Sequence, residues 1–227
     1  MPALDNNARL IRGLRPLVPR SFHRRGALDR SFRRIRKEKL GGDYFEFGVY
    51  RGSTFAHAGR LTRRHLPSSS MRLFGFDSFQ GLPSPTGMEG ATGEFLEGDF
   101  SCALPEVRKN LDRRGVDWSR VHLVEGWFDE TLNDDLKATL RPAPVAIALI
   151  DCDLYRSTLS VLEFLEDLLQ QGSILLFDDW DCFGGRNHMG ERRAFAEFLQ
   201  TSTRVVAEPW IRFGRRGQGF VIHIDPD

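Results

Sequence analysis

Short apolar runs alternate with helix-like segments along most of this chain. The continuous apolar runs at 145–150 and 173–177 are typical of strands covered on both faces of a sheet. Segment 54–66 reads as a helix that ends before a proline, and segment 105–114 as a helix with proline in its first turn and glycine just past its end. Strands that alternate with helices predict a mostly parallel sheet with helices on both faces.

The same hydrophobic pattern predicts the order of the strands and helices. Strands are predicted at 44–47, 72–76, 121–124, 145–150, 173–177 and 220–224, and helices at 54–66, 105–114, 129–140, 159–171 and 191–200. The first 40 residues read as one or two helices broken near Pro16 and Pro19. Residues 78–100 are rich in glycine and proline and are expected to form one long loop, which in a compact domain is usually functional.

Composition fits one globular domain. The 227 residues are 41% hydrophobic and 28% charged. The sequence contains no run of 18 apolar residues, so no membrane span is predicted. The N-terminus lacks the apolar core of a secretory signal. Cys102, Cys152 and Cys182 are too few and too widely spaced for a disulfide framework or a zinc site, so we expect reduced thiols in a cytoplasmic protein.

Charge is unevenly distributed along the chain. Residues 1–42 hold twelve basic and three acidic side chains, a net +9, whereas residues 43–227 carry a net −8. We predict a basic helical arm over 1–42 and one catalytic domain over 43–227. A basic arm could bind nucleic acid or an anionic membrane, but no aromatic or glycine pattern of an RNA-binding module accompanies it. We favour an arm that packs on the body, or on a second subunit as a homodimer, through Leu10, Leu14, Leu17 and Phe32.

A glycine-containing turn follows the first predicted strand. Glu46, Gly48 and Gly52 have a spacing unlike the G-x-G-x-x-G of dinucleotide binders, which cradles a pyrophosphate. Two glycines four apart still let the backbone approach a ligand that lacks phosphates, such as S-adenosylmethionine. Glu46 would accept from the ligand's ammonium group or order the turn. Glycines of a tight turn are also often structural, so this motif alone leaves both interpretations open.

Asp77 ends the second predicted strand, about 25 residues after Gly52. A carboxylate at this place can accept hydrogen bonds from both hydroxyls of a ribose. The alternative is an aspartate that only caps the following loop. The two motifs in this order indicate a nucleoside-containing cofactor, and they do not by themselves exclude NAD.

Four carboxylates follow two buried strands. Asp151 and Asp153 come after the run at 145–150, and Asp178 and Asp179 after the run at 173–177. Adjacent parallel strands would bring these groups together, and ionised carboxylates so close repel unless they are protonated or bridged by a cation. Oxygen ligands favour Mg²⁺, Mn²⁺ or Ca²⁺. Separate helix caps at Asp153 and Asp179 are the alternative, and a divalent metal site is the interpretation we favour.

These motifs and one further segment resemble the macrocin O-methyltransferase family, whose members methylate sugar hydroxyls of antibiotics. The matching segments are 45–54 (FEFGVYRGST), 74–83 (FGFDSFQGLP), 126–132 (GWFDETL), 150–158 (IDCDLYRST) and 177–180 (FDDW). The resemblance covers about residues 43–224. It implies an α/β, Rossmann-like class I methyltransferase fold with a mostly parallel seven-stranded sheet, S-adenosyl-L-methionine as methyl donor, and Mg²⁺ (or Mn²⁺) as cofactor.

The resemblance also implies roles for particular residues. Asp151, Asp178 and Asp179 would bind the metal, and Asp153 would be the general base, with His188 as an alternative. The residues expected around the donor are Glu46, Gly48, Tyr50, Arg51, Gly52, Ser53, Asp77, Ser78, Gly126, Trp127 and Asp151. Asp151 and Asp153 are two residues apart, so an extended segment would point both side chains the same way.

Other residues near these motifs have two interpretations each. Trp127, Phe128, Trp180 and Phe183 could line the pocket or belong to the core, and Cys152 could be a soft metal ligand or a buried apolar group. The family usually has tyrosine where this chain has Trp180. That difference, the basic arm and the 78–100 loop leave the acceptor open. The prediction is an O-methyltransferase acting on a hydroxyl of a sugar or natural product, and the alternatives are an NAD-linked sugar oxidoreductase or an RNA-binding methyltransferase.

Overall fold

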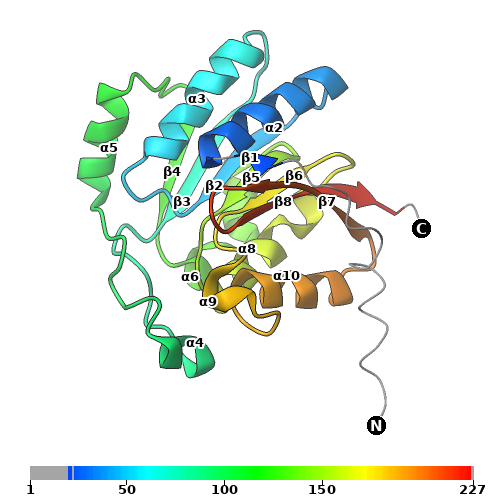
Figure 1. Cartoon of the computed structure of the whole chain (residues 1–227). Coiled ribbons are helices and arrows are strands. Elements are labelled where there is room, and N and C mark those ends of the chain that lie inside the picture. The colour runs from blue at the N-terminus through cyan, green and yellow to red at the C-terminus, as the bar shows by residue number, and fades with distance from the viewer. Residues whose placement is uncertain (1–19, 22, 226–227) are drawn as a thin grey trace.

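A computed structural model of the chain describes residues 20–21 and 23–225. One sheet of eight strands runs through the molecule in the order β1-β7-β8-β6-β5-β2-β3-β4 (Figure 1). Neighbouring strands pair parallel from β6 to β4, and β8 pairs antiparallel with β6 and β7. The strands are β1 (Arg20–Ser21), β2 (Asp43–Phe47), β3 (Leu73–Asp77), β4 (Val121–Glu125), β5 (Val145–Ile150), β6 (Ile174–Phe177), β7 (Val205–Phe213) and β8 (Gly217–Ile224).

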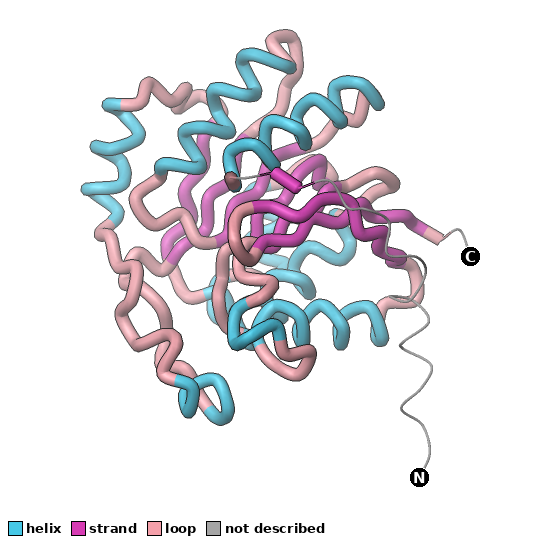
Figure 2. Tube along the Cα trace, viewed as in Figure 1, coloured by secondary structure: helices cyan, strands magenta, loops and turns pink. Residues whose placement is uncertain are grey.

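Helices cover both faces of this sheet, as the alternating pattern predicted (Figure 2). The long helices are α2 (Arg24–Glu38), α3 (Ser53–His65), α5 (Leu104–Arg113), α8 (Tyr155–Leu165) and α10 (Gly190–Thr201). Shorter ones are α4 (Gly87–Thr92), α6 (Phe128–Thr131), α7 (Asp134–Leu140), the 3₁₀ turn η1 (Glu166–Leu168) and α9 (Cys182–Gly185). No helix within the described parts of the chain is both long and apolar enough to span a bilayer.

Two hydrophobic cores follow from the alternation of side chains along the strands. On one face, Tyr44 and Leu149 pack with helices α2, α3 and α5. On the other, Phe45, Phe47 and Ile150 pack with α8 and α10. The phenylalanines of β2 and β3 stack on this second face, with ring centroids 4.7 Å apart for Phe47 and Phe76. The central strands are therefore apolar on both faces, which is why they read as continuous runs.

Helix α2 is part of the first core. Its Ala27, Leu28, Phe32 and Ile35 are completely buried. Phe32 therefore packs on the body of the molecule, as one of the two interpretations of the basic segment expected. Leu10, Leu14 and Leu17 lie outside the described residues, and the domain boundary at residue 42 and the homodimer stay predictions.

Several elements differ from the predicted ones. The 78–100 loop contains helix α4, and the helix predicted at 129–140 is two helices, α6 and α7, because the Asn133 side chain accepts from the Leu136 amide and begins a new helix. Helix α8 begins at Tyr155 rather than 159. Strand β7 was missed because Pro209 and charged residues interrupt its pattern, and the strand contains a register shift beginning at Pro209.

The order of strands fixes where a ligand can bind. Strand β2 pairs with β3 on one side and with β5 on the other, so the chain reverses its winding direction between β2 and β5. In open sheets of this kind, ligands bind beyond the carboxyl ends of the strands at such a point. Every motif singled out from the sequence lies at this end of the sheet.

Candidate active site

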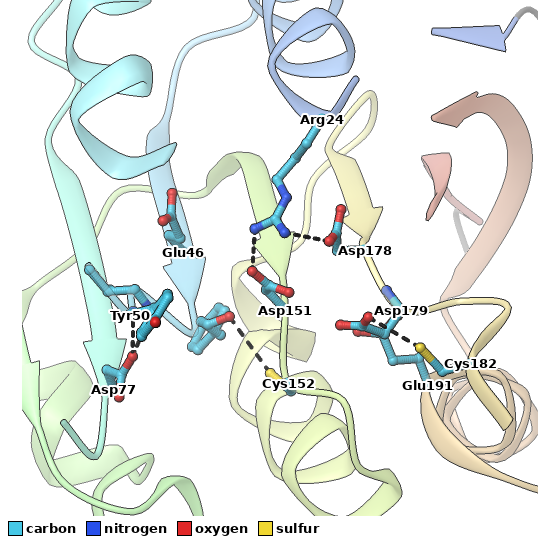
Figure 3. A network of polar contacts seen from close by, with 12 residues as sticks. Arg24, Glu46, Tyr50, Asp77, Asp151, Cys152, Asp178, Asp179, Cys182 and Glu191 are labelled. Carbon is cyan, nitrogen blue, oxygen red and sulfur yellow. Dashed lines mark hydrogen bonds and ion pairs between the residues drawn. The ribbon is translucent and has the colours of Figure 1, made fainter. Parts of the chain in front are cut away.

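A cavity of about 1600 Å³ opens at the carboxyl ends of β2, β3, β5 and β6. Pockets for one small molecule are typically about 300–1,000 Å³, so this cavity has room for a cofactor and an acceptor together. Glu46 and Asp77 line one side of it, and Asp151, Asp178 and Asp179 line the other (Figure 3). The structure thus brings the two sets of predicted residues into one space.

Glu46 is a buried acid on the side of the cavity where the sequence predicts the methyl donor, called the donor side below. Its side chain is 1% exposed, and the Tyr44 hydroxyl donates to its Oε2 at 2.5 Å. Burial raises the pKa of Glu46 to about 8, against the opposing effects of the Tyr44 hydrogen bond and of the Arg24 charge. The carboxyl group lines the cavity, so it can accept a hydrogen bond from a ligand.

The turn after β2 lies against the strand that carries Asp151. Gly48 has φ 90°, and a Cβ placed there would lie 2.1 Å from the Asp151 carbonyl oxygen. Glycine is therefore required by both its conformation and its close contact. Gly52 begins α3 with φ 74°, and its Cβ would meet Leu111. Gly52 does not line the cavity, and its role is to pack α3 against α5.

Asp77 holds this turn in place. Its Oδ2 accepts from the amides of Val49 and Tyr50, both at 2.8 Å, and its Oδ1 accepts from the Phe79 amide at 2.7 Å. Burial raises the pKa of Asp77, while these three amides lower it. The carboxylate also lines the cavity and keeps lone pairs for a ligand hydroxyl, so its turn-ordering role does not prevent it from accepting from a ligand.

The other residues expected around the donor also lie here. Tyr50, Arg51, Ser53, Ser78, Gly126 and Trp127 all line the cavity. The Ser78 hydroxyl donates to the Gly81 carbonyl at 2.9 Å and so orders the next turn. Gly126 has φ 144°, and a Cβ there would lie 2.3 Å from the Thr131 methyl group, so the chain can pass between β4 and α6 only without a side chain.

On the other side, Asp151, Asp178 and Asp179 form a compact acidic group. Each offers one oxygen within 4.8 Å of the others. Burial and the Asp151 charge raise the pKa of Asp178 to about 7, although Arg24 opposes this. Burial and its acidic neighbours also raise the pKa of Asp179. Parallel pairing of β5 with β6 produces this contact, as the sequence predicted.

Two buried oxygens in this group have no protein partner among the described residues. They are Oδ2 of Asp179 and Oε1 of Glu191. The other Glu191 oxygen accepts from the Asp179 amide at 3.0 Å, and the Cys182 thiol donates to Asp179 Oδ1 at 3.2 Å. Buried carboxylate oxygens without donors are costly, and the chemistry of three clustered carboxylates suits a hard divalent cation. Glu191 was not predicted, because one acid in the first turn of a helix gives no sequence signal.

Asp153 lies beside this group in an unusual conformation. It has φ 60°, and the Leu154 amide donates to the Cys152 carbonyl at 2.6 Å, so the segment turns tightly instead of continuing the strand. The segment is therefore not extended at Asp153, although Asp151 and Asp153 both line the cavity. Burial and Asp151 raise the pKa of Asp153 to about 8, and its side chain lines the cavity.

Arg24 is a cation that sequence reasoning missed. It comes from the first turn of α2, and its guanidinium pairs with Asp151 and, at 2.5 Å, with Asp178 Oδ2 (Figure 3). Burial by itself lowers the pKa of Arg24. The charges of the two carboxylates outweigh this effect and raise the pKa above its usual value. No local pattern pointed to this contact, because Arg24 is one of twelve basic residues in its segment and lies 127 residues before Asp151.

The segment between β3 and α5 forms a wall of the cavity. Glu89 of α4 accepts at one oxygen from the Tyr155 amide (3.0 Å) and the Gly190 amide (2.8 Å), which begin α8 and α10. Glu94 accepts from the Phe183 amide at 2.7 Å and pairs with Arg216 at 2.6 Å. The predicted functional loop is therefore fastened to the elements that follow the acidic strands.

Some candidate residues lie elsewhere. His188 is exposed in the turn before α10 and does not line the cavity, since the chain turns Met189 inward there instead. Trp180 packs against Phe177 and Phe220 in the second core. Trp127 and Phe128 do line the cavity, whereas Phe183 does not. The Cys152 side chain is buried next to the Phe47 carbonyl, 3.8 Å away, as expected of a small apolar group.

The sequence profile of the family described as macrocin-O-methyltransferase matches residues 21–212 of this chain. The chain belongs to the macrocin O-methyltransferase family. This confirms the resemblance drawn from the motifs, and it gives no support to an NAD-linked oxidoreductase or an RNA methyltransferase.

Three known proteins are similar to this chain. It is 31% identical over 144 residues to the 8-demethyl-8-(2,3-dimethoxy-alpha-L-rhamnosyl)-tetracenomycin-C 4'-O-methyltransferase of Streptomyces olivaceus, covering 61% of this chain and 53% of that protein. It is 26% identical over 151 residues to the mycinamicin III 3''-O-methyltransferase of Micromonospora griseorubida, covering 63% and 57%. The crystal structure of a calicheamicin methyltransferase has a TM-score of 0.69 at 24% identity, covering 87% of this chain and 77% of that one. The chain thus matches little more than half the length of these two sequence relatives, and the structural likeness confirms the class I methyltransferase fold.

Proposed function

We propose that this protein transfers a methyl group from S-adenosyl-L-methionine to a hydroxyl of a sugar or glycosylated natural product, with the help of a divalent metal ion. The observation that carries the proposal is that the donor cradle and the acidic group line one cavity large enough for two ligands. Family membership supports it, because the relatives above are named as O-methyltransferases.

The donor would lie along the ends of β2, β3 and β4. Glu46 and the first-turn amides of α3 suit the ammonium and carboxylate of its amino-acid end, because a carboxylate accepts from ammonium and a helix N-terminus favours an anion. Asp77 would accept from ribose hydroxyls while it holds the turn. Gly126 and Trp127 then line the side where the adenine ring would fit.

In the reaction, an acceptor oxygen displaces the sulfonium sulfur at the methyl carbon, the carbon–sulfur electron pair stays on sulfur, and the hydroxyl proton goes to a base. Asp153 is the proposed base, because it is buried, lines the cavity and adjoins Asp179. Asp151, Asp178 and Asp179 would hold Mg²⁺ or Mn²⁺, which when bound lowers the pKa of a hydroxyl. Exposed His188 is not retained as a base.

The wall of the cavity indicates the kind of acceptor. Four of the large exposed hydrophobic side chains lie on this wall or next to it: Tyr50, Met88, Leu96 and Phe100. Tyr50 and Phe100 line the cavity, and their rings meet edge to face at 5.9 Å. These exposed hydrophobic side chains would contact the apolar polyketide part of a glycosylated polyketide, while its sugar points into the cavity. The names of the relatives, which include a rhamnosyl tetracenomycin enzyme, support this class.

The test is methyl transfer from S-adenosylmethionine to rhamnosylated and otherwise glycosylated polyketides with Mg²⁺, followed by mass spectrometry. A product heavier by one methylene supports the proposal. Saturating donor binding without methylation of any hydroxylated sugar would point instead to a protein that binds the donor without transferring its methyl group.

A further inference from the structure

A basic side chain occupies the mouth of the proposed metal site. Arg24 Nη1 contacts Asp151 Oδ2, and Arg24 Nη2 contacts Asp178 Oδ2. One planar guanidinium therefore bridges the ends of β5 and β6, the strands whose carboxylates form the acidic group. Figure 3 shows its side chain reaching down from α2 between them.

A guanidinium and a divalent ion in the same acidic group would repel each other. Like charges about 4 Å apart in a partly buried site repel each other far more strongly than they do in bulk water. Asp151 and Asp178 are each 19% exposed, so water screens the pair only in part. A metal that takes oxygens from both aspartates therefore requires Arg24 to move.

The Arg24 side chain borders open space, whereas its helix is packed in the core. It is 33% exposed and borders the cavity, whereas α2 is held by its buried side chains Leu28, Phe32 and Ile35. Arg72 offers a contrast, because it pairs with almost fully buried Asp43 and also donates to two backbone carbonyls. The Arg72 side chain is 31% exposed, nearly as much as that of Arg24, so the difference lies in its two additional carbonyl partners. Arg24 contacts carboxylates and also borders the cavity, into which its side chain can withdraw.

We propose that Arg24 is a built-in counter-cation, which stabilises the acidic group without metal and is displaced when a divalent ion enters, so that it lowers metal affinity by competition. This inference rests on the metal site of the proposed function. Competition of this kind is a coupling between two cations, and such couplings commonly change affinity about 5- to 150-fold.

The test is titration of the metal-free full-length protein with Mn²⁺, with free Mn²⁺ measured by electron paramagnetic resonance. Arg24→Met should bind Mn²⁺ about tenfold more tightly than the wild type, or tighter still. Exposed Arg30 lies on the same helix, so Arg30→Met removes the same charge away from the acids and should bind like the wild type. Arg24→Lys keeps one charge without the two-pronged bridge and should fall between.

Thermal unfolding gives a second readout. In EDTA, Arg24→Met should melt below the wild type because its carboxylates repel unopposed, and saturating Mn²⁺ should raise its melting temperature by more than that of the wild type. Weaker or unchanged Mn²⁺ affinity in Arg24→Met would overturn the inference and make Arg24 a support of the metal site or a bystander. If neither wild type nor Arg24→Met binds Mn²⁺, the metal in the proposed function is itself wrong.

Discussion

At the ends of β2, β3 and β4, the cavity is bordered by backbone turns and by a carboxylate that accepts amide hydrogen bonds. At the ends of β5 and β6, it is bordered instead by ionisable side chains that face one another. The donor side satisfies its charges locally: Asp77 accepts from three amides of neighbouring turns. The acidic side depends on Arg24 and leaves two buried oxygens without a protein partner.

The two sides of the cavity are therefore built from different kinds of chain segment. The donor side is built mainly from short segments close to β2 and β3, so it should form without any ion. The acidic side combines residues from distant parts of the chain, including Arg24 and Glu191, and it should gain stability from a cation. Substitutions on one side should therefore leave binding on the other side nearly unchanged.

The largest effect is expected from Asp179, whose buried Oδ2 has no partner among the described residues. Asp179→Asn should abolish Mn²⁺ binding and lower kcat by about 10²–10⁴-fold, because a metal contributes several kcal/mol to such a reaction. Affinity for S-adenosylhomocysteine, measured by calorimetry, should stay within about twofold. Full turnover of the wild type in excess EDTA would show that these acids serve another purpose.

A similar loss without loss of metal is expected at Asp153. Asparagine tolerates the left-handed conformation found there, so Asp153→Asn should fold. Its kcat should fall by about 10²–10⁴-fold, the usual contribution of a general base. Mn²⁺ and donor affinities should be kept, and a more acidic acceptor such as a phenol should recover part of the rate. Loss of Mn²⁺ binding equal to that of Asp151→Asn would make Asp153 a ligand instead.

On the donor side, Asp77→Asn is the more informative change. Gly48→Val would press a side chain against the Asp151 backbone and so disturb both halves at once. In Asp77→Asn one carboxylate oxygen becomes a donor, which cannot accept from the turn amides, and S-adenosylhomocysteine affinity should fall about tenfold or more. Mn²⁺ affinity is the control. A drop in both affinities would show that the two halves do not act separately.

Substitutions in the segment between β3 and α5, which forms a wall of the cavity, should change the acceptor KM alone. Glu89→Ala removes the acceptor shared by the Tyr155 and Gly190 amides and should raise the acceptor KM about tenfold. Exposed Glu97 lies in the same segment, so Glu97→Ala is the matched control and should leave the acceptor KM at its original value. An unchanged acceptor KM in Glu89→Ala would mean that the wall does not contact the acceptor.

The smallest effect concerns pH. The pKa of Glu46 is about 8 in the folded protein and near 4.5 in an unfolded chain. The stability linked to its bound proton is complete below the unfolded value and is lost as pH rises through about 8. Melting temperature in EDTA should therefore fall less in Glu46→Gln than in the wild type between about pH 5.5 and 8.5. Parallel curves would show that Glu46 is ionised throughout.

The sequence located most of the residues that border the cavity at the ends of β2, β3 and β4, because their signals are local. Glycines at 48 and 52 and an aspartate after the next strand stand in one short stretch, and apolar runs located the strands that carry the acids. It missed Arg24, Glu89 and Glu191, since each meets its partners only through the fold. It also considered an extended chain at Asp153, where the backbone instead makes a tight turn.

The most direct test of a shared cavity is nuclear magnetic resonance of S-adenosylmethionine carrying a ¹³C-labelled methyl group, bound to the protein with and without Mn²⁺. Paramagnetic relaxation falls steeply with distance, so it reports whether the methyl group lies beside the ion. We predict strong broadening of the bound methyl signal in the wild type, and none in Asp179→Asn. A sharp methyl signal from donor bound together with Mn²⁺ would contradict the account, because donor and metal would then occupy separate places.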